Sequence, residues 1–219
     1  FMAALDKAKL KGIPVVALKV GQTELSAKLA QSHSGALAGN DAAYEAVFEH
    51  CGVQRVQSMD ELSATLALFA AYPKLGPGKL ASLHDSGGLR GMVIDLAHRN
   101  SVPFADINQE TTDKLTATLA YGLPAVNPVD AWAGDPDWPA GFGDCFPAVV
   151  ADPDTAIGAV FTDFGANDVD EFTYQLAKVC TDAAARSDKP IVAATYTSRQ
   201  FHPGVLLALA ENGIPVLDG

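Results

Sequence analysis

The hydrophobic positions at the start of the chain form a helical stripe followed by a continuously apolar run. Residues 1–12 place Phe1, Leu5 and Ala8 on one face of a helix, with lysines on the other face. The segment "IPVVALKVG" (residues 13–21) is apolar at nearly every position, which is typical of a strand covered on both faces. Because the first helix has no N-cap of its own, we expect the chain to begin inside a domain and to be a fragment of a longer protein.

Two more helices and a short strand are expected in the segment that follows. Asn40 or Asp41 can cap a helix through "DAAYEAVFEHCG", and "VQRV" predicts a short strand. Ser58 precedes a helix in "MDELSATLALFAAY", where Glu61 stands at the position that completes a capping box. The segment "YPKLGPGK" is rich in Pro and Gly and has no periodicity, so we place a domain boundary between residues 72 and 73.

The second part of the chain alternates between short apolar runs and helical patterns. The runs predict strands at Leu80–Leu83, Pro103–Ile107, Ile157–Phe161, Pro190–Ala194 and Ile214–Leu217. Helical patterns lie at about Leu89–Arg99, Gln109–Leu119, Phe142–Val150, Asp170–Arg186 and Val205–Asn212. Repeated βα steps of this kind predict a parallel sheet with helices on both faces. We therefore expect an α/β protein with two parallel-sheet (flavodoxin- or Rossmann-like) domains, 1–72 and 73–219, in three-layer α/β/α arrangements, the first one incomplete.

Composition and charge restrict the classes of partner. With 48% hydrophobic residues among 219, the chain has enough apolar material for packed cores. A net charge of −11 gives no general attraction to nucleic acid or to anionic membranes, so small molecules or other proteins are the expected partners. No apolar run approaches the roughly 18 residues of a membrane span, and no basic leader precedes a hydrophobic stretch.

Cysteine and histidine spacing bears on the compartment and on metal binding. The three cysteines lie far apart and no pair has redox or metal spacing, which favours buried thiols in a reducing cytoplasm. No two histidines have the spacing of metal ligands, so we expect no metal site in this chain.

The segment "AQSHSGALAG" (residues 30–39) places one histidine among small residues and glycines. The imidazole of His33 is its only reactive side chain, and the small flanks Ser32, Ser34 and Gly35 would let that ring approach or leave a ligand. Taken alone, the segment leaves two interpretations open. It is either a surface loop with a solvated histidine or a mobile loop that carries a reactive one.

A glycine-led segment ahead of an expected helix is a candidate for binding phosphate. In "HDSGGLRG" (residues 84–91), Ser86, Gly87 and Gly88 lead into a helix whose free backbone N–H groups and dipole favour an anion. A tight turn that needs glycine explains the same pattern equally well. His84, at the end of the preceding strand, is either a site residue or a hydrogen-bonded structural histidine.

A second candidate lies in "DFGANDVDEF", where Gly165, Ala166 and Asn167 precede another expected helix. Asn167 can cap that helix without any ligand, and the neighbouring aspartates Asp163 and Asp168 oppose a bare anion. The segment therefore takes phosphate only if a cation accompanies it.

Other polar residues are expected to have structural roles. In "AVNPVDAW", Asn127 stands before a proline in an extended rigid turn, and Asp130 is placed for hydrogen bonding rather than for acid–base work. Asp152 and Asp154 flank a proline in a turn, and we expect both to be solvated.

Several segments together resemble a known family. The stretch "VVALKVGQTELSAKLAQSHSGALAGNDAAYEAVFEHCGVQRVQSMDEL" resembles the carboxyl-terminal part of the ligase domain in the nucleoside-diphosphate-forming acyl-CoA synthetases, relatives of succinyl-CoA synthetase. "HDSGG", "VNPVD" and the closing "GIPVLDG" resemble the flavodoxin-like succinyl-CoA ligase domain that follows it in single-chain members. The resemblance therefore identifies residues 1–72 as the carboxyl-terminal part of the ligase domain and residues 73–219 as the flavodoxin-like succinyl-CoA ligase domain.

The resemblance implies a chemical role for His33. In this family the histidine at that position takes a phosphoryl group from an acyl-phosphate and passes it to a nucleoside diphosphate. The small neighbours then permit the loop to swing between two sites. The sequence departs from many relatives after "SGG", where Leu89 and Arg90 replace a second glycine, and Arg90 either pairs with a phosphate or faces solvent.

The resemblance also implies partners that this chain does not contain. The intact, cytoplasmic enzyme uses coenzyme A, ATP or ADP and magnesium, with CoA-binding and ATP-grasp domains on the same chain or on a partner chain, and is expected to be a homo-oligomer. The fragment itself is expected to hold no cofactor and to be inactive alone. Two alternatives stay open: a non-catalytic regulatory or scaffold module that binds a phosphorylated ligand or coenzyme A, and the sensor part of an acyltransferase-linked relative.

Overall fold

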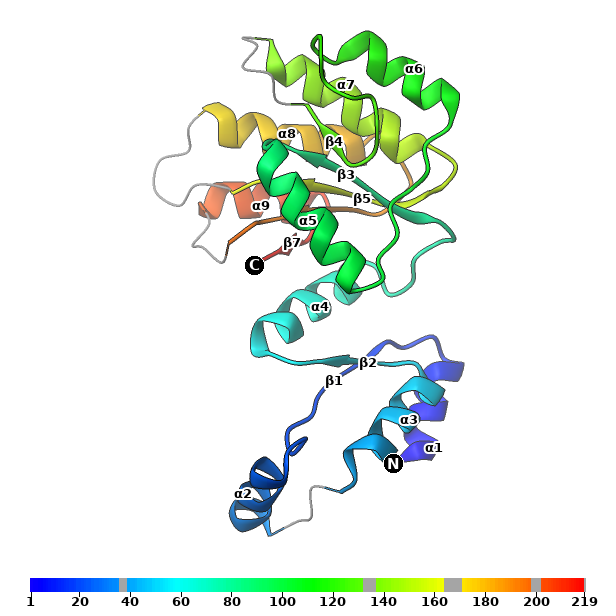
Figure 1. Cartoon of the computed structure of the whole chain (residues 1–219), viewed down its shortest axis with the longest axis vertical. Helices are drawn as coiled ribbons and strands as arrows, with labels where there is room; N and C mark the ends of the chain where they lie inside the picture. Colours follow the sequence, from blue (N-terminus) through cyan, green and yellow to red (C-terminus); the bar gives the residue numbers. More distant parts are fainter. Residues whose placement is uncertain (36–38, 132–136, 164–170, 198–201, 219) are drawn as a thin grey trace. The chain divides into compact units, whose positions relative to one another are not determined.

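The chain folds into two compact units (Figure 1), Phe1–Lys74 and Leu75–Gly219. The structure is a computed structural model and describes residues 1–35, 39–131, 137–163, 171–197 and 202–218. The first unit gives way to the second within "YPKLGPGK", the Pro- and Gly-rich segment expected to separate two domains. Each unit is built on a parallel sheet, which confirms the expected α/β class.

The first unit packs helices around a two-stranded parallel sheet. Strand β1 (Val15–Leu18) pairs with β2 (Val53–Val56) in parallel. The helices described in this unit are α1 (Met2–Leu10), α2 (Glu24–Ser34), α3 (Asp41–Cys51) and α4 (Met59–Ala71). Phe48, Cys51 and Val53 form a small buried core.

Two of these helices begin at the caps that the sequence predicts. The side chain of Asn40 accepts a hydrogen bond from the backbone N–H of Ala43 at the start of α3. Ser58 Oγ accepts from the N–H of Glu61 at 3.1 Å, and the Glu61 carboxylate accepts from the N–H of Gln57 at 2.6 Å. The bonds to Asn40 and Ser58 satisfy backbone donors that the first turn of a helix leaves free, and the bond from Gln57 ties the preceding residue to the same turn.

Helix α2 corrects the expectation of a loop around His33. The Thr23 side chain caps its start by accepting from the N–H of Ser26 at 3.2 Å, and Gly35, at φ 71°, ends it. The expectation of a loop is wrong as far as Ser34, because a capped run of good helix formers extends through the serines. His33 therefore lies in the last helical turn.

The second unit contains a five-stranded parallel sheet in the order β4-β3-β5-β6-β7. The strands are β3 (Lys79–His84), β4 (Val129–Asp130), β5 (Thr155–Phe161), β6 (Ile191–Ala194) and β7 (Val216–Leu217). The helices described are α5 (Gly87–Arg99), α6 (Gln109–Thr118), α7 (Trp138–Ala151), α8 (Glu171–Ala184) and α9 (Pro203–Glu211). Helices α7 and α8 cover one face of the sheet and α5 lies on the other, which gives three layers (Figure 1).

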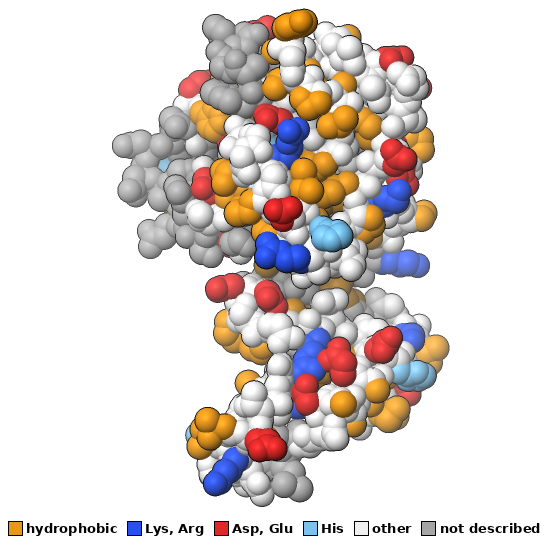
Figure 2. Space-filling model, in the orientation of Figure 1, with side chains coloured by type: hydrophobic (Ala, Val, Ile, Leu, Met, Phe, Trp, Pro, Cys, Tyr) orange, Lys and Arg blue, Asp and Glu red, His pale blue; other side chains and the backbone are white. Residues whose placement is uncertain are grey.

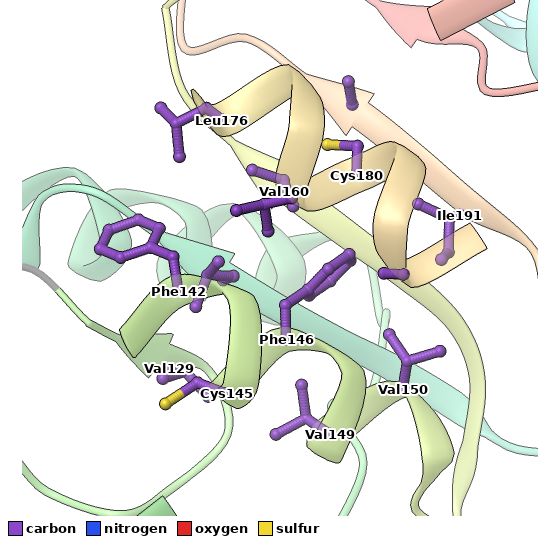
Figure 3. Packing of buried hydrophobic residues seen from close by; sticks show 14 of the residues in the cluster. Val129, Phe142, Cys145, Phe146, Val149, Val150, Val160, Leu176, Cys180 and Ile191 are labelled. Atoms are coloured by element: carbon purple, nitrogen blue, oxygen red, sulfur yellow. The ribbon is translucent and has the colours of Figure 1, made fainter. Parts of the chain in front are cut away.

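The main core lies between the sheet and α7 and α8. Phe142 and Phe146 of α7 are fully buried, and Figure 3 shows them pointing toward the strands and α8. A Cβ on Gly158 of β5 would lie 2.5 Å from Cγ2 of Val150, so this position has no room for a side chain. All three cysteines are free and buried, as expected.

The predicted strand at Pro103–Ile107 is reduced to a single bridge between Leu80 and Phe104. The amide side chain of Asn127 explains the difference. Its Nδ2 donates to the carbonyls of Leu80 (2.9 Å) and Ala105 (3.0 Å), while its Oδ1 accepts from the N–H of Ser82 at 2.9 Å. A side chain thus takes up backbone groups that a longer ladder would have used.

Asp152 is buried, which corrects the expectation that it is solvated. The residue is only 2% exposed. Its carboxylate accepts hydrogen bonds from the N–H of Asn108 (2.9 Å), the hydroxyl of Thr111 (2.7 Å) and the N–H of Asp154 (3.0 Å). Asp154 in turn pairs with Lys79 at 2.7 Å on the partly exposed rim. The turn is a hydrogen-bonded junction between α7, β5 and α6.

Among the described residues, no helix is both long and apolar enough to span a membrane. On the face shown in Figure 2, acidic and basic side chains are interspersed with hydrophobic ones. Several of the latter belong to α5, whose partly exposed apolar residues are Leu89, Met92, Ile94 and Leu96.

Candidate functional site

His33 stands exposed in the last turn of α2. The hydroxyl of Ser32 donates to the carbonyl of Leu29 at 2.8 Å, and the N–H of Gly35 donates to the carbonyl of Gln31 at 2.8 Å. Ser32 and Gly35 therefore support the end of the helix that carries His33, and Gly35 does so in a left-handed conformation that glycine adopts without strain. Ser34 is the last residue of α2, and its side chain lies outside the description.

The carboxyl ends of β3, β5 and β6 bring a second group of polar residues together. His84 ends β3 and Asp85 follows it, Thr162 follows β5, and Tyr196 follows β6. Ligands of parallel α/β sheets bind beyond this edge, so the cluster lies where a site is expected.

His84 is completely buried and fully engaged. Its Nε2 lies 2.9 Å from Ser82 Oγ and its Nδ1 lies 3.1 Å from the hydroxyl of Tyr196. The ring stacks on Phe161 with centroids 4.9 Å apart and planes 7° from parallel. Burial, helped by the charge of Arg90, lowers the pKa of His84 to about 3. The imidazole is therefore neutral in ordinary conditions.

The carboxylate of Asp85 is hydrogen-bonded to two side chains of this group. Its Oδ2 accepts from the hydroxyl of Thr162 at 2.6 Å, and its carboxyl is also hydrogen-bonded to Tyr196. Burial raises the pKa of Asp85, an effect that the two hydrogen bonds oppose and the nearby Asp163 adds to. Burial and the neighbouring Asp85 also raise the pKa of Tyr196, so the phenol keeps its proton.

The start of α5 is built around Ser86, Gly87 and Gly88, as predicted. Ser86 Oγ caps the helix by accepting from the N–H of Leu89, and both glycines are exposed. The Arg90 guanidinium donates to the carbonyl of Pro128 at 3.3 Å. This bond is to a backbone oxygen of the protein, so the half-buried Arg90 helps to fix the turn before β4.

The second phosphate candidate, Gly165, Ala166 and Asn167, lies outside the described residues. Directly before it, Asp163 Oδ1 accepts from the N–H groups of Tyr196 (3.1 Å) and Thr197 (3.2 Å), which ties the ends of β5 and β6 together. Within the part of the chain that the structure describes, no group of three His, Cys, Asp or Glu side chains is arranged to hold a metal ion.

Sequence reasoning overlooked Asp85, Thr162 and Tyr196. Asp85 and Thr162 follow directly after the strands β3 and β5, and Tyr196 lies two residues after the end of β6; these positions were the available signal. Of the two alternatives for His84, a site residue or a hydrogen-bonded structural histidine, the structure shows the hydrogen-bonded one.

The chain resembles known proteins over different parts of its length. Residues 1–69 match the family model described as "Succinyl-CoA ligase like flavodoxin domain". That match lies in the first unit. The assignment of residues 1–72 to the end of a ligase domain and of residues 73–219 to a flavodoxin-like ligase domain stays a prediction. Relatives that are ADP-forming acetate–CoA and 4-hydroxybutyrate–CoA ligases confirm the resemblance to the nucleoside-diphosphate-forming acyl-CoA synthetases.

Three relatives illustrate the extent of the similarity. The acetate–CoA ligase (ADP-forming) I of Archaeoglobus fulgidus is 41% identical over 117 residues, which are 53% of this chain and 17% of that protein. The corresponding ligase of Methanocaldococcus jannaschii is 32% identical over 117 residues, 53% of this chain and 17% of its own length. The 4-hydroxybutyrate–CoA ligase (ADP-forming) of Nitrosopumilus maritimus is 33% identical over 125 residues, which are 57% of this chain and 18% of that protein. The matched part is therefore less than a fifth of each relative.

Solved structures confirm the fold over the whole chain. The dinucleotide-forming acetyl-coenzyme A synthetase 1 of Ca. Korarchaeum cryptofilum, in complex with phosphate and ADP, superposes with a TM-score of 0.79 and 20% identity, covering 99% of this chain and 46% of that one. PH0766 from Pyrococcus horikoshii OT3 superposes with a TM-score of 0.77 and 20% identity, covering 100% of this chain and 45% of that one. At this identity the likeness establishes the fold alone.

Proposed function

We propose that the chain is part of an acyl-CoA synthetase that makes acyl-CoA from a carboxylic acid, coenzyme A and ATP and forms a nucleoside diphosphate. The observation that carries the proposal is the exposed His33 at the end of α2, inside the segment that matches the succinyl-CoA ligase-like model. The named activities of the relatives favour the same reaction class.

His33 is the proposed phosphoryl carrier. A neutral ring nitrogen attacks the phosphorus of an acyl-phosphate, an N–P bond forms, and the P–O bond to the carboxylate breaks to release the acid. The phosphoryl group then passes to a nucleoside diphosphate and the imidazole is restored. During acyl-CoA synthesis these steps run in reverse, and coenzyme A displaces phosphate from the acyl-phosphate.

Other groups complete the proposal. The exposed turn at Ser86–Gly88 and the segment 165–167 are the proposed phosphate-facing surfaces. Coenzyme A, ATP or ADP and magnesium bind through CoA-binding and ATP-grasp domains of the same or a partner chain, in a homo-oligomer. The 219 residues alone are expected to make no thioester, since the part that matches the relatives covers less than a fifth of their length.

Phosphohistidine labelling of the intact protein tests the carrier role. Incubation with γ-labelled ATP and magnesium should give one acid-labile, base-stable label that His33→Asn abolishes together with turnover. His50→Asn is the matched control, because His50 is also an exposed histidine in the last turn of a helix. This control should retain both label and turnover.

Two outcomes would contradict the proposal. A turnover of His33→Asn within about tenfold of the parent, roughly 1.4 kcal/mol in barrier, would show that the covalent route is not used. If the parent binds phosphate or coenzyme A but takes no label and makes no thioester, the non-catalytic binding module replaces the synthetase.

A further inference from the structure

A continuous row of hydrogen-bonding side chains crosses the carboxyl edge of the five-stranded sheet. It runs from Ser82 to His84, from His84 to Tyr196, and from Tyr196 to Asp85, and Thr162 is bonded to Oδ2 of Asp85. Ser82 and His84 are completely buried, and neither has a role in the phosphoryl transfer proposed above. The row therefore needs an explanation of its own.

The carboxylate at one end of the row fixes the direction of the bonds, since the hydroxyl of Ser82 at the other end can either donate or accept. An ionised Asp85 only accepts, so the Tyr196 hydroxyl donates its single proton to the carboxylate. The Tyr196 oxygen then accepts from Nδ1–H of His84, because the buried imidazole is neutral and carries one proton. Nε2 is left bare and accepts from the hydroxyl of Ser82 at 2.9 Å.

The charged groups around the row come from three elements. Arg90 of α5 disfavours a positive charge on His84. Asp163, after β5, disfavours a negative charge on Asp85, and Asp130 of β4 disfavours ionisation of Tyr196. Burial in the first place, together with these charges, keeps His84 and Tyr196 neutral and leaves Asp85 as the member that gains or loses a proton.

We propose that Ser82, His84 and Tyr196 form a directed positioning relay, in which buried His84 is held as its Nδ1–H tautomer and aims the Tyr196 hydroxyl at Asp85. Asp85 directly precedes the first turn of α5, so the relay sets the charge and orientation of the carboxylate beside that turn. His84 acts through Tyr196 and is a positioning residue. The relay stands on the geometry of the second unit and does not depend on the carrier role of His33.

Nuclear magnetic resonance of the 219-residue chain tests the relay directly. Nitrogen-15 spectra of labelled histidine report which ring nitrogen of His84 carries the proton, and the carboxyl carbon of Asp85 reports its titration midpoint. At neutral pH the proton of His84 should be on Nδ1. Tyr196→Phe should raise the Asp85 midpoint by about one pH unit, since it removes a hydrogen bond to a charged group.

The decisive variant is Ser82→Ala, because Ser82 is separated from Asp85 by two members of the row. Without the serine hydroxyl, Nε2 loses the donor that favours the Nδ1–H tautomer, so the share of His84 with its proton on Nδ1 should fall. Where the proton moves to Nε2, the bare Nδ1 competes with Asp85 for the tyrosine proton, so the midpoint of Asp85 should rise. Ser82→Thr restores the hydroxyl and should return both signals toward the parent values. Unchanged His84 and Asp85 signals in Ser82→Ala, or an Nε2–H tautomer in the parent, would overturn the relay even if Tyr196→Phe shifts Asp85.

Discussion

The Cβ position of Gly87 lies 2.5 Å from Oδ2 of Asp130, so the first turn of α5 is built directly against the carboxylate that ends β4. The two residues belong to "HDSGG" and "VNPVD", the segments that carried the resemblance in the second part of the chain. A side chain at position 87 would have to displace the carboxylate of Asp130, which is itself buried.

We expect Gly87→Ala to lower the free energy of unfolding by about 1–3 kcal/mol, because the new methyl group displaces either Asp130 or the helix start. Gly88→Ala is the matched control, since its added Cβ meets no atom within 4 Å. The control should change stability by no more than about 0.5 kcal/mol in urea unfolding. Equal effects of the two substitutions would contradict the packing explanation.

His84 makes the chain sensitive to acid. Its pKa is about 3 in the folded state against 6.5 for the unperturbed group, so its contribution to stability is complete above pH 6.5 and is lost as the pH falls toward 3. Between about pH 7 and about pH 5 the loss is about 2 kcal/mol. Urea unfolding at both pH values should show this extra loss in the parent relative to His84→Gln. Parallel profiles would mean that His84 is not buried as a neutral ring.

Asp152, the buried residue that follows α7, should be required for stability. Burial alone would raise the pKa of Asp152, but its hydrogen bonds with Asn108, Thr111 and Asp154 bring that pKa below the ordinary value. Asp152→Ala leaves these donors without a partner. The free energy of unfolding should therefore fall by about 1–3 kcal/mol, the cost of a buried unsatisfied group. Asp182→Ala, which removes an exposed helical ion pair with Lys178, should cost no more than about 0.5 kcal/mol. Similar losses in the two variants would show that the Asp152 junction is solvated.

Gly158 and Gly143 should respond to alanine in opposite directions. A methyl group at Gly158 enters the core 2.5 Å from Val150 and 3.1 Å from Phe146, and overpacking of this kind costs about 1–3 kcal/mol. At Gly143, in α7, the added Cβ meets no atom within 4 Å, and the better helix former should add about 0.5–1 kcal/mol. The midpoints of thermal unfolding of the two variants distinguish the cases. A stabilised Gly158→Ala variant would show that the core has room for a methyl group beside Val150 and would contradict the packing explanation.

The candidate site was predicted in part. The position of His33 and the glycine-led start of α5 followed from local sequence, because capping residues and glycines act on their immediate neighbours. The helical state of His33 was missed, since small polar residues between a capped helix and a glycine have no hydrophobic period to reveal them. The bond of Arg90 to Pro128 could not be foreseen, because its partner comes from another part of the chain.

The sequence by itself determined the alternation of strands and helices and the caps at Asn40 and Ser58, because those features depend on residues within a few positions of one another. Only the tertiary structure decided which polar groups are buried and what they bind. His84 meets Tyr196 across 112 positions, and Asp85 meets Thr162 across 77. Parallel strands place their carboxyl ends side by side whatever their separation in the chain, so a row of hydrogen bonds forms there that no local pattern contains.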